Sequence, residues 1–584
     1  MDNKQNKIEV KRHSLSHIMT IAVQELWPNV KFAIGSAIEN GFYYDFDFGD
    51  KKVSEDDLEK IEKKMNFLIK QNVKFEKNEL KIDEAIAKEL NRDQVYKVEL
   101  LKNLKNNGKL IVSYYKTGDF EDLCLGPHIE SVKVFEKGSF IINKIAGAYW
   151  KGDEKNRMLT RIYGVAFDSR DELEKYKKNI KEAEKRDHRK LGKELDLFCF
   201  SELVGPGLPL FTPKGVAIID ELQKRVEKIC RDYGFGKVST PHLTKIDLYE
   251  ISGHKTKFGD ELFYVKSHYK DNYVLKPVQC PHHIQIYLSN PRSYRELPIR
   301  YMESEKQYRD EKPGELCGLQ RVIPITVEDG HIFCTPEQIK EEIKNIVNII
   351  QNFYGSLGIG DDRWVSLSVR DYEHPEKYIG DLKDWDECEK ILQEISDEMG
   401  LNAKKCEGEA ALYGPKLDFM FKDATGREVQ IPTIQLDFAT PKKFNMIYID
   451  KEGKEKIPVM IHRAILGSYE RFLMLLIEHF AGAFPVWLSP VQVKIISVSE
   501  KHIEYCKKLA QEFRNKNIRV EINDNNETVG NKIRKATQEK IPYILVIGDK
   551  EMNSSKLTLR DRGKKETREI EKNKFLEEIK NIVK

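Results

Sequence analysis

The chain has 584 residues, of which 40% are hydrophobic and 33% charged, and its formal net charge is +3. This composition is typical of soluble globular proteins and excludes a largely disordered chain, and no apolar run reaches the roughly 18 residues of a membrane span. Because the charge is nearly balanced, any contact with nucleic acid must come from local patches. Nine scattered cysteines and a start without a signal-peptide core predict a reducing compartment, so we expect a cytoplasmic protein.

The first part of the chain predicts an α+β domain. Residues 13–27 place apolar side chains at helical spacing, and the run at 31–48 predicts two strands joined at the Asn40-Gly41 turn. Charged helices and further strands are expected at 54–72, 83–90 and 108–150. We place this domain at 1–165 and a charged helical linker at 166–200.

Two further domains are predicted after the linker. Residues 201–488 interleave amphipathic helices with strand-like runs, and this length suits one large mixed sheet. Residues 489–584 alternate strands with helices at short spacing, which indicates a small α/β domain with a largely parallel sheet. Three folded domains lie at the lower end of the range of about three to five expected for this length.

The stretch VQCPHHIQIY brings Cys280, His282 and His283 within four positions, too close to complete a tetrahedral metal shell by themselves. Two later histidines, His331 and His462, lie in strand-like runs and are candidate partners for Cys280. Three such ligands would suit zinc and leave coordination open for a substrate. The alternative, which spacing alone favours, is that these histidines are hydrogen-bonded core residues.

Two arginine-bearing segments point to a phosphate ligand. Arg309 and Glu311 fall in a predicted strand-turn-strand segment, and Arg471 in GSYERF falls on a predicted helix. The planar guanidinium matches phosphate with two hydrogen bonds and stacks on flat rings, as ATP binding requires. The alternative is that these arginines form ordinary surface salt bridges.

A second group of possible metal ligands lies near the N-terminus. His13 and His17 are four apart and share one helix face, and Cys124 and His128 follow with the same spacing. Taken alone, this is a four-ligand zinc pattern. The alternative is a helix with two buried histidines beside an unrelated loop.

Several ordered motifs resemble a known family. Pro241, the Arg309-x-Glu311 loop and the segment from Gly467 to Arg471 resemble motifs 1, 2 and 3 of class II aminoacyl-tRNA synthetases. The blocks KPVQCPHH, EDGHIFC, ALYGPKLDF, TIQLDF and PVMIHRAILGSYERF resemble the threonyl-tRNA synthetase family, from about His13 to the C-terminus. The resemblance implies an α+β multidomain protein: an editing domain, a class II antiparallel-sheet catalytic core at 201–488 and an α/β anticodon-binding domain at 489–584.

The resemblance also implies roles for residues of the core. Zinc, one ion per chain, is expected on Cys280, His331 and His462, and Mg²⁺ is expected with ATP. Further roles are implied as follows: Arg309 on the α-phosphate, Glu311 at the adenine edge, Arg471 stacked on adenine, Arg321 on the γ-phosphate, Asp329, Tyr413 and Gln430 on threonine, and Gln435 and His254 near the terminal adenosine of tRNA. The implied partners are threonine tRNA, ATP, L-threonine and a second copy of the chain in a homodimer.

The implied metal explains why editing is needed. Threonine and valine have nearly the same shape, so an apolar pocket rejects valine poorly, whereas an open zinc that takes the amino and hydroxyl groups rejects it strongly. Serine keeps both groups and lacks only a methyl, worth roughly 1–3 kcal/mol. A second, hydrolytic site is therefore expected. Zinc as a source of hydroxide is the less attractive role here, since hydroxide would destroy the activated amino acid.

The family resemblance places that hydrolytic site in the N-terminal domain. We predict hydrolysis of seryl-tRNA by a positioned water without a metal, although a metal here stays an alternative. The residues implied are His13, His17, Cys124 and His128, with Asp122, Lys97 and Tyr44 as neighbours. In the C-terminal domain the resemblance implies that Asn526, Glu551 and Arg560 read anticodon bases, and that Lys532, Arg534 and Lys540 meet phosphates.

The sequence departs from the family pattern at its start and at three internal sites. It begins at the editing helix, where most bacterial members carry a small ubiquitin-like module. Val327 stands where Gln is usual, Ile431-Pro432 where Cys-Gly is common, and Cys317 where His is usual. Two alternatives stay open: a non-catalytic RNA-binding regulator and a free-standing editing hydrolase. Arg309, Arg471 and the three candidate ligands weigh against both, because neither function needs them.

Overall fold

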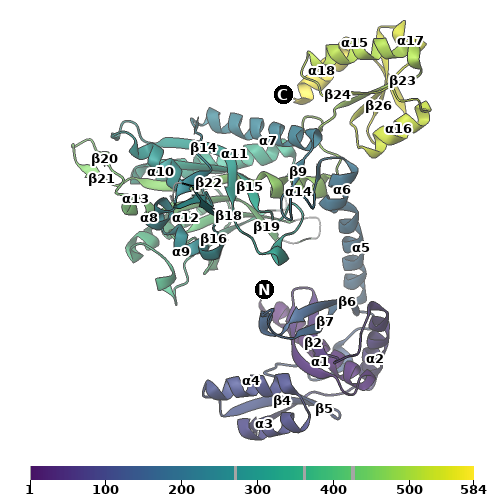
Figure 1. The fold of residues 1–584 in the computed structure, drawn as a ribbon, viewed down its shortest axis with the longest axis vertical. Helices are drawn as coiled ribbons and strands as arrows, with labels where there is room; N and C mark the ends of the chain where they lie inside the picture. The colour runs from purple at the N-terminus through teal and green to yellow at the C-terminus, as the bar shows by residue number, and fades with distance from the viewer. Residues whose placement is uncertain (1, 269–271, 360–362, 423–425, 427, 584) are drawn as a thin grey trace. The chain divides into compact units, whose positions relative to one another are not determined.

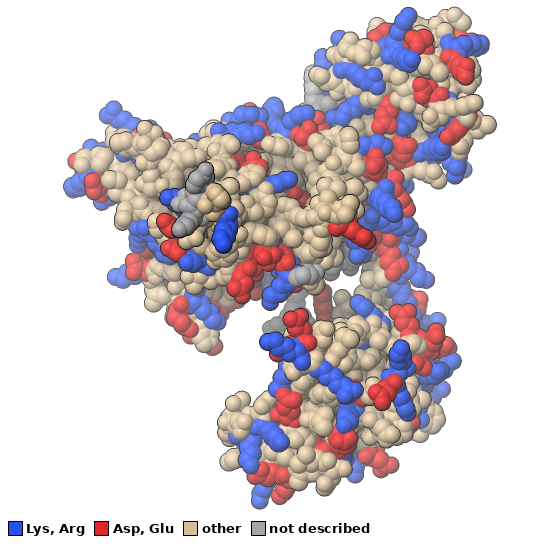
Figure 2. All heavy atoms as spheres, viewed as in Figure 1, with Lys and Arg blue, Asp and Glu red and all other residues tan. Residues whose placement is uncertain are grey.

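The computed structural model describes residues 2–268, 272–359, 363–422, 426 and 428–583. They form two compact units, Met1–Lys181 and Glu182–Lys584 (Figure 1). On the face shown in Figure 2, Lys and Arg lie among Asp and Glu over both units, in keeping with the nearly balanced charge. Among the described residues, no helix combines the length and apolarity needed to cross a membrane.

The first unit consists of two antiparallel sheets and the helices that cover them. Its elements are α1 (Asp2–Leu26), β1 (Lys31–Ile38), β2 (Gly41–Asp47), α2 (Leu58–Lys70), β3 (Glu76–Lys81), α3 (Ile82–Asn91), α4 (Val95–Asn106), β4 (Ile111–Thr117), β5 (Phe120–Leu123), β6 (Phe140–Tyr149), β7 (Met158–Ala166) and the start of α5 (Arg170–Arg186). The sheet of order β1-β2-β7-β6 packs on α1 and α2, and the sheet of order β3-β4-β5 packs on α3 and α4. The sequence analysis did not predict α4.

The second unit begins with a large, mainly antiparallel sheet. Its elements are α6 (His188–Glu194), β8 (Phe198–Cys199), β9 (Leu210–Phe211), α7 (Pro213–Asp232), β10 (Gly236–Lys237), β11 (Leu243–Lys245), α8 (Asp247–Ser252), α9 (His254–Phe258), β12 (Tyr264–Lys266), β13 (Asn272–Leu275), α10 (Cys280–Leu288), β14 (Ile299–Tyr308), β15 (Pro324–Cys334), α11 (Ile339–Leu357), β16 (Trp364–Val369), α12 (Leu382–Glu398), β17 (Lys404–Glu407), β18 (Lys416–Lys422), β19 (Glu428–Asp437), α13 (Ala439–Lys443), β20 (Tyr448–Ile449), β21 (Glu455–Lys456), β22 (Val459–Ser468) and α14 (Tyr469–Phe480). Eight strands form one sheet of order β10-β14-β15-β22-β19-β18-β16-β17, in which only the outermost pair at each edge is parallel.

The two faces of this sheet carry different side chains because residues alternate along a strand. Ile332 of β15 and Ile461 of β22 belong to the largest apolar core, which α7, α11 and α14 complete. Their neighbours His331 and His462 therefore point to the opposite face. Leu191 and Leu195, in the second half of the predicted linker, also pack into this core, so that half belongs to the second unit.

The end of the chain forms a five-stranded sheet with its own core. Its elements are β23 (Val493–Ser497), α15 (Ile503–Arg514), β24 (Val520–Asn523), α16 (Val529–Gln538), β25 (Tyr543–Ile547), α17 (Asp549–Met552), β26 (Lys556–Asp561), β27 (Thr567–Glu571) and α18 (Lys572–Val583). The order is β24-β23-β25-β26-β27. The first three strands are parallel and the last two antiparallel, so the sheet is mixed rather than largely parallel as predicted. The hairpin β26–β27 runs along the edge without a crossover helix, which is why its direction alternates.

Candidate active site

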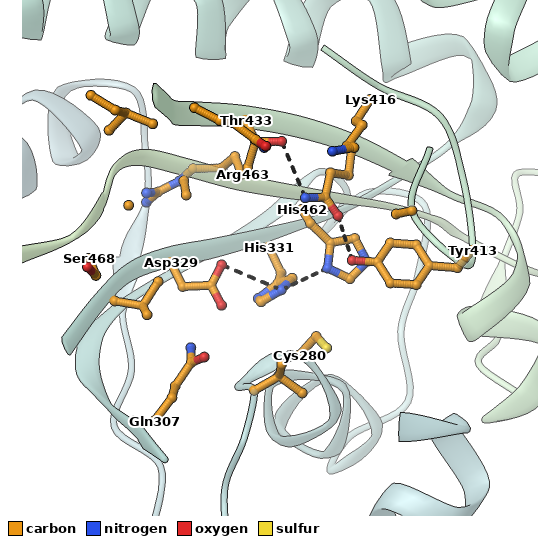
Figure 3. A pocket seen from close by; sticks show the side chains of 18 of the residues that line it. Cys280, Gln307, Asp329, His331, Tyr413, Lys416, Thr433, His462, Arg463 and Ser468 are labelled. Atoms are coloured by element: carbon orange, nitrogen blue, oxygen red, sulfur yellow. Dashed lines mark hydrogen bonds and ion pairs between the residues drawn. The ribbon is translucent and has the colours of Figure 1, made fainter. Parts of the chain in front are cut away.

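Strand pairing brings together the two histidines predicted to share a metal with Cys280. His331 of β15 lies directly opposite His462 of β22, and directly opposed residues have neighbouring side chains on one face. The His331 Nε2 and His462 Nδ1 atoms are 3.1 Å apart. Cys280, the first residue of α10, completes a group whose ligand atoms lie within 4.8 Å of one another (Figure 3). The three residues are therefore placed as a metal site requires.

Outer hydrogen bonds fix which nitrogen of each histidine faces this group. The Nδ1 atoms of His331 and His283 are 2.7 Å apart, and His283 Nε2 is 3.2 Å from a carboxylate oxygen of Glu303. A carboxylate accepts, so His283 gives Glu303 its Nε2–H and His331 donates its Nδ1–H to the bare Nδ1 of His283. His331 Nε2 is then left without a proton and faces Cys280 and His462.

His462 is oriented in the same way by Asp437. Its Nε2–H donates to Asp437 Oδ2 over 3.0 Å, and Asp437 Oδ1 accepts the backbone N–H groups of Ala439 and Thr440. The lone pair of His462 Nδ1 therefore also faces the group. One thiol and two bare imidazole nitrogens are a donor set that suits zinc. Burial raises the pKa of the Cys280 thiol well above its usual value, and Asp329 and Asp437 add to this, so a bound metal would have to displace its proton.

The candidate metal site opens into a cavity of about 520 Å³. Seven of the residues to which the sequence analysis gave substrate roles line it: His254, Arg309, Asp329, Tyr413, Gln430, Gln435 and Arg471. Arg309 Nε is buried with no hydrogen-bond partner among the described residues, and burial lowers the pKa of its guanidinium. A buried guanidinium N–H without an acceptor is costly, so this position favours an anionic ligand.

The polar groups near His331 and His462 hold one another in place. Burial raises the pKa of Asp329 to about 6, against the opposing influence of neighbouring histidines, and Asp329 Oδ1 accepts the N–H of Gly330. Tyr413 stacks on the His462 ring and donates its hydroxyl hydrogen to Gln435. These side chains surround the space next to the candidate ligands, where a small amino acid would lie.

Glu311 and Arg321 are the two predicted ATP contacts that do not line this cavity. Arg321 Nε donates to Glu311 Oε2 over 2.6 Å, and its Nη2 lies 2.7 Å from Glu315. Both lie in the turn between β14 and β15, and Arg471 Nε donates to the carbonyl of Gln320 in the same turn. The predicted phosphate and adenine contacts of this pair would require the ion pairs to open.

Two histidines near Cys280, His254 and His282, do not belong to the candidate metal group. His254 Nδ1 lies 2.8 Å from Ser252 Oγ, and burial lowers its pKa to about 3, so it is neutral. His282 is buried, and neither ring nitrogen has a hydrogen-bond partner among the described residues. His283 contacts His331, as described above. His282 and His283 are thus packing or hydrogen-bonding neighbours of the candidate metal group rather than members of it.

The first unit brings all seven predicted editing residues together. Lys97 of α4 lies 2.7 Å from Asp122 of β5 and donates to the Tyr44 hydroxyl, which in turn donates to Asp122. Together with His13, His17 and Cys124, these three residues line a cavity of about 850 Å³. His128 does not line it, because its ring stacks on Phe75.

The thiol of Cys124 is the centre of the N-terminal cluster. It lies 3.3 Å from His13 Nε2 and 3.4 Å from His128 Nε2, and it accepts the N–H of Gly126. Burial raises the pKa of Cys124 to about 11 and lowers that of His128 to about 2. Burial also lowers the pKa of His17 well below its usual value, and charges on His13 and Lys97 lower it further. With His17, these ligand atoms lie close enough for a metal, so the prediction of a metal-free site stays a prediction.

Comparison with known proteins now defines the family. Residues 263–480 match the class II tRNA synthetase core domain for G, H, P, S and T, and residues 492–582 match the anticodon binding domain. Residues 112–163 match the second additional domain of threonyl- and alanyl-tRNA synthetases. The threonine–tRNA ligase of Thermotoga maritima is 44% identical over 98% of this chain and 88% of its own length. That of Clostridium botulinum is 45% identical over 100% and 90%.

The chain belongs to the threonine–tRNA ligase family. It is thus a class II aminoacyl-tRNA synthetase with a class II core, an anticodon-binding domain and an N-terminal editing domain, as the resemblance implied. A crystal structure titled as the RNA binding domain of threonyl-tRNA synthetase from Cryptosporidium parvum is 36% identical, with a TM-score of 0.64 over 68% of this chain and 98% of that one.

The three residues predicted to read bases come from three different segments of the anticodon-binding domain. Asn526 follows the carboxyl end of β24 and Glu551 follows that of β25, with β23 between these strands. Glu551 accepts the hydroxyl hydrogen of Thr558, whereas Arg560 lies two residues further along β26 and donates to a loop carbonyl. Lys532 is buried and donates to the carbonyl of Ser497, so the prediction that it meets a phosphate is wrong.

The sequence analysis missed the groups that orient the candidate ligands. Glu303, Lys276 and Thr240 form a buried network behind His283, in which Lys276 Nζ donates to Thr240 Oγ1 and Thr240 donates to Glu303. Asp437 stands in the TIQLDF block already quoted for the resemblance. In the sequence, each of these residues is only a polar residue in or beside an apolar run. That pattern does not distinguish a carboxylate that orients a histidine from one that is exposed to solvent.

Proposed function

We propose that this chain attaches threonine to threonine tRNA in two steps, forming threonyl-adenylate from ATP and then transferring the threonyl group to tRNA. The observation that carries this proposal is that one cavity joins Arg309 and Arg471 to Asp329 and the group Cys280, His331 and His462. The arginines suit the phosphates and the adenine ring of ATP, which would bring Mg²⁺ with it.

Selection of threonine falls to the side chains around the candidate ligands. Zinc, when bound there, would offer coordination to the amino and hydroxyl groups of threonine, and valine lacks the second group. Asp329 lies next to the ligands and suits the substrate ammonium, while Tyr413 stacks on the His462 ring and Gln430 lines the same cavity. Gln435 and His254 are proposed to lie near the terminal adenosine of the tRNA.

The test of activation is threonine-dependent exchange between ATP and pyrophosphate, which requires no tRNA. We expect exchange with threonine, weaker exchange with serine, and exchange with valine reduced by several orders of magnitude. A zinc-replete protein that shows no threonine-dependent exchange would refute the proposal. Exchange equally fast with valine would refute only the metal-based selection.

The N-terminal cavity is proposed to hydrolyse seryl-tRNA with a positioned water. A neutral Cys124 and neutral histidines supply donors and acceptors, and Lys97, paired with Asp122 and Tyr44, supplies a fixed positive charge. Cys124→Ala and His17→Ala variants should accumulate seryl-tRNA, whereas Cys406→Ala, which changes a half-buried cysteine on β17, should not. Misacylation unchanged in both test variants would overturn this assignment.

Two assembly features complete the proposal. The C-terminal domain would bind the anticodon of threonine tRNA through unstacked bases, with Asn526, Glu551 and Arg560 as the contacts. The chain would form a homodimer through motif 1, the segment that runs from α7 through β10 to Pro241. Sedimentation of the full chain at micromolar concentration tests the dimer, and a monomer would refute it.

A further inference from the structure

A single buried histidine joins the end of the linker helix to two parts of the active site. His188 begins α6, two residues after the end of α5, in which the boundary between the two units falls. Its Nδ1 lies 2.8 Å from Glu478 Oε1 on α14, the helix that carries Arg471. Its Nε2 accepts the backbone N–H of Leu319, in the turn that carries Arg321, over 3.1 Å. No role above has been given to His188.

The hydrogen bonds fix the state of this imidazole. Leu319 N–H can only donate, so His188 Nε2 carries a lone pair, and the ring proton on Nδ1 is donated to Glu478. Packing supports the contact: Gly318 has a φ of +50°, and a Cβ built there would lie 2.3 Å from His188 Nε2. The turn therefore passes against the ring itself, with glycine at the point of closest approach.

The same turn is held from its other side by the helix of motif 3. Arg471 Nε donates to the carbonyl of Gln320, one residue after the N–H that His188 accepts. Leu319 is fully buried in the main core between these two contacts. Backbone hydrogen bonds between Cys317 and Arg321 close the turn. The position of Arg321 relative to α14 thus depends on the contacts of the turn with His188 and Arg471, since the surface ion pairs of Arg321 are too weak to fix it alone.

The geometry assigns to His188 the role of a positioning residue: it holds the ATP-binding turn at 312–323 against α14 and ties that turn to the point where the chain arrives from the editing unit. His188 touches no substrate in this assignment. It acts through Leu319 on Arg321, and through Glu478 on the helix of Arg471. The inference rests on the proposed function, because the turn matters only if it binds ATP.

Two substitutions separate the two hydrogen bonds. In His188→Asn the amide reaches the place of Nδ1 and keeps the contact with Glu478, but Leu319 N–H loses its acceptor. In His188→Gln the amide oxygen reaches the place of Nε2 and restores that acceptor. We expect His188→Asn to raise KM for ATP in the exchange reaction by about 10-fold, the size of one lost hydrogen bond, with KM for threonine changed less than about 2-fold. His188→Gln should lie within about 3-fold of the wild type for both substrates.

A matched control is His502→Asn, which also replaces a buried histidine, but in the C-terminal domain. Because the exchange reaction requires no tRNA, this variant should leave both KM values unchanged. If both His188 variants fail to fold, Gly318→Ala provides the second variant, since its methyl must push the turn away from His188, and the same rise in KM for ATP is expected. An unchanged KM for ATP in His188→Asn or in Gly318→Ala, or equal effects of the Asn and Gln substitutions, would overturn the inference. Absence of exchange in the wild type would instead overturn the proposed function.

Discussion

The two Cys–His clusters of this chain are built from the same residue types and differ in what surrounds them. In the catalytic core, His331 and His462 each give their outer N–H to an acceptor, so bare nitrogens face Cys280. In the editing domain, His13 and His128 both turn Nε2 toward the thiol of Cys124, which is also engaged by a backbone N–H. The first cluster turns its lone pairs toward one another, whereas in the second the thiol is in hydrogen-bonding contact with both histidines and a backbone N–H.

The charges next to the two clusters differ as well. Asp329 and Asp437 act on Cys280 and raise the pKa of its thiol beyond the effect of burial. Asp122 raises the pKa of Cys124 in the same way, but its carboxylate is paired with the buried ammonium of Lys97, which adds to burial in lowering the pKa of His17. A charge that repels a proton also repels a divalent cation. Ligand spacing alone therefore does not decide between a metal site and an acid–base site, because the charges and hydrogen bonds of the neighbouring residues also determine whether a cation binds.

The largest effect expected from this comparison comes from the two cysteines. Cys280→Ser should lower bound zinc from one ion per chain to near none and reduce threonine-dependent exchange by more than about 100-fold, because a direct ligand contributes more than an outer hydrogen bond. Cys124→Ser should leave zinc content unchanged. Elemental analysis of the dialysed proteins measures both. Loss of zinc from the Cys124 variant would show that the editing cluster also holds metal.

The next effect concerns the outer acceptor of His462. In Asp437→Asn the amide no longer matches both the imidazole N–H and the two backbone N–H groups that the carboxylate accepts. We expect zinc affinity, measured by competition with a chelator, to fall by roughly 10–100-fold. Asp122→Asn makes the same chemical change beside the editing cluster, and there zinc content should not respond. Equal affinities of Asp437→Asn and the wild type would remove the orienting role.

The sequence indicated which residues form the candidate metal group better than it indicated their surroundings. His331 and His462 are 131 positions apart, and the resemblance grouped them because their blocks are distinctive; the structure brings them together. Glu303 lies in none of these blocks, and Lys276 received no role although it opens the KPVQCPHH block, since their contact becomes visible only when β14 and the segment before α10 are placed side by side. Helix α4 was missed although it carries Lys97, because its polar and apolar residues alternate with weak helical periodicity.

A weaker effect should follow from changing the charge beside the editing cluster. Lys97→Met removes the ammonium and leaves Asp122, so the field around His17 becomes favourable to a cation. In a Cys280→Ser background, where the core site is removed, we expect affinity for Co²⁺ at His13, His17, Cys124 and His128 to rise about 10-fold, which corresponds to roughly 1.4 kcal/mol. Absorption of the cobalt–thiolate complex reports it. If affinity does not change, the charge of Lys97 does not separate the two clusters.

The smallest effect expected is in the pH dependence of seryl-tRNA hydrolysis. This measurement distinguishes most directly between a positioned water without a metal and a zinc-bound water. Burial lowers the pKa of His128 to about 2, lowers those of His13 and His17, and raises that of Cys124 to about 11. A lowered histidine pKa means that the neutral form persists to lower pH, so His17, His128 and Cys124 keep their charge between pH 6 and 8, and the pKa of His13 is shifted in the same direction. The enzymatic rate, after subtraction of spontaneous hydrolysis, should vary less than about 2-fold over this range. A histidine of ordinary pKa acting as base would give about a 4-fold rise, and a zinc-bound water with a pKa near 7 would give about a 10-fold rise. A rise of the latter size would place a metal in the editing cluster and make the two clusters alike.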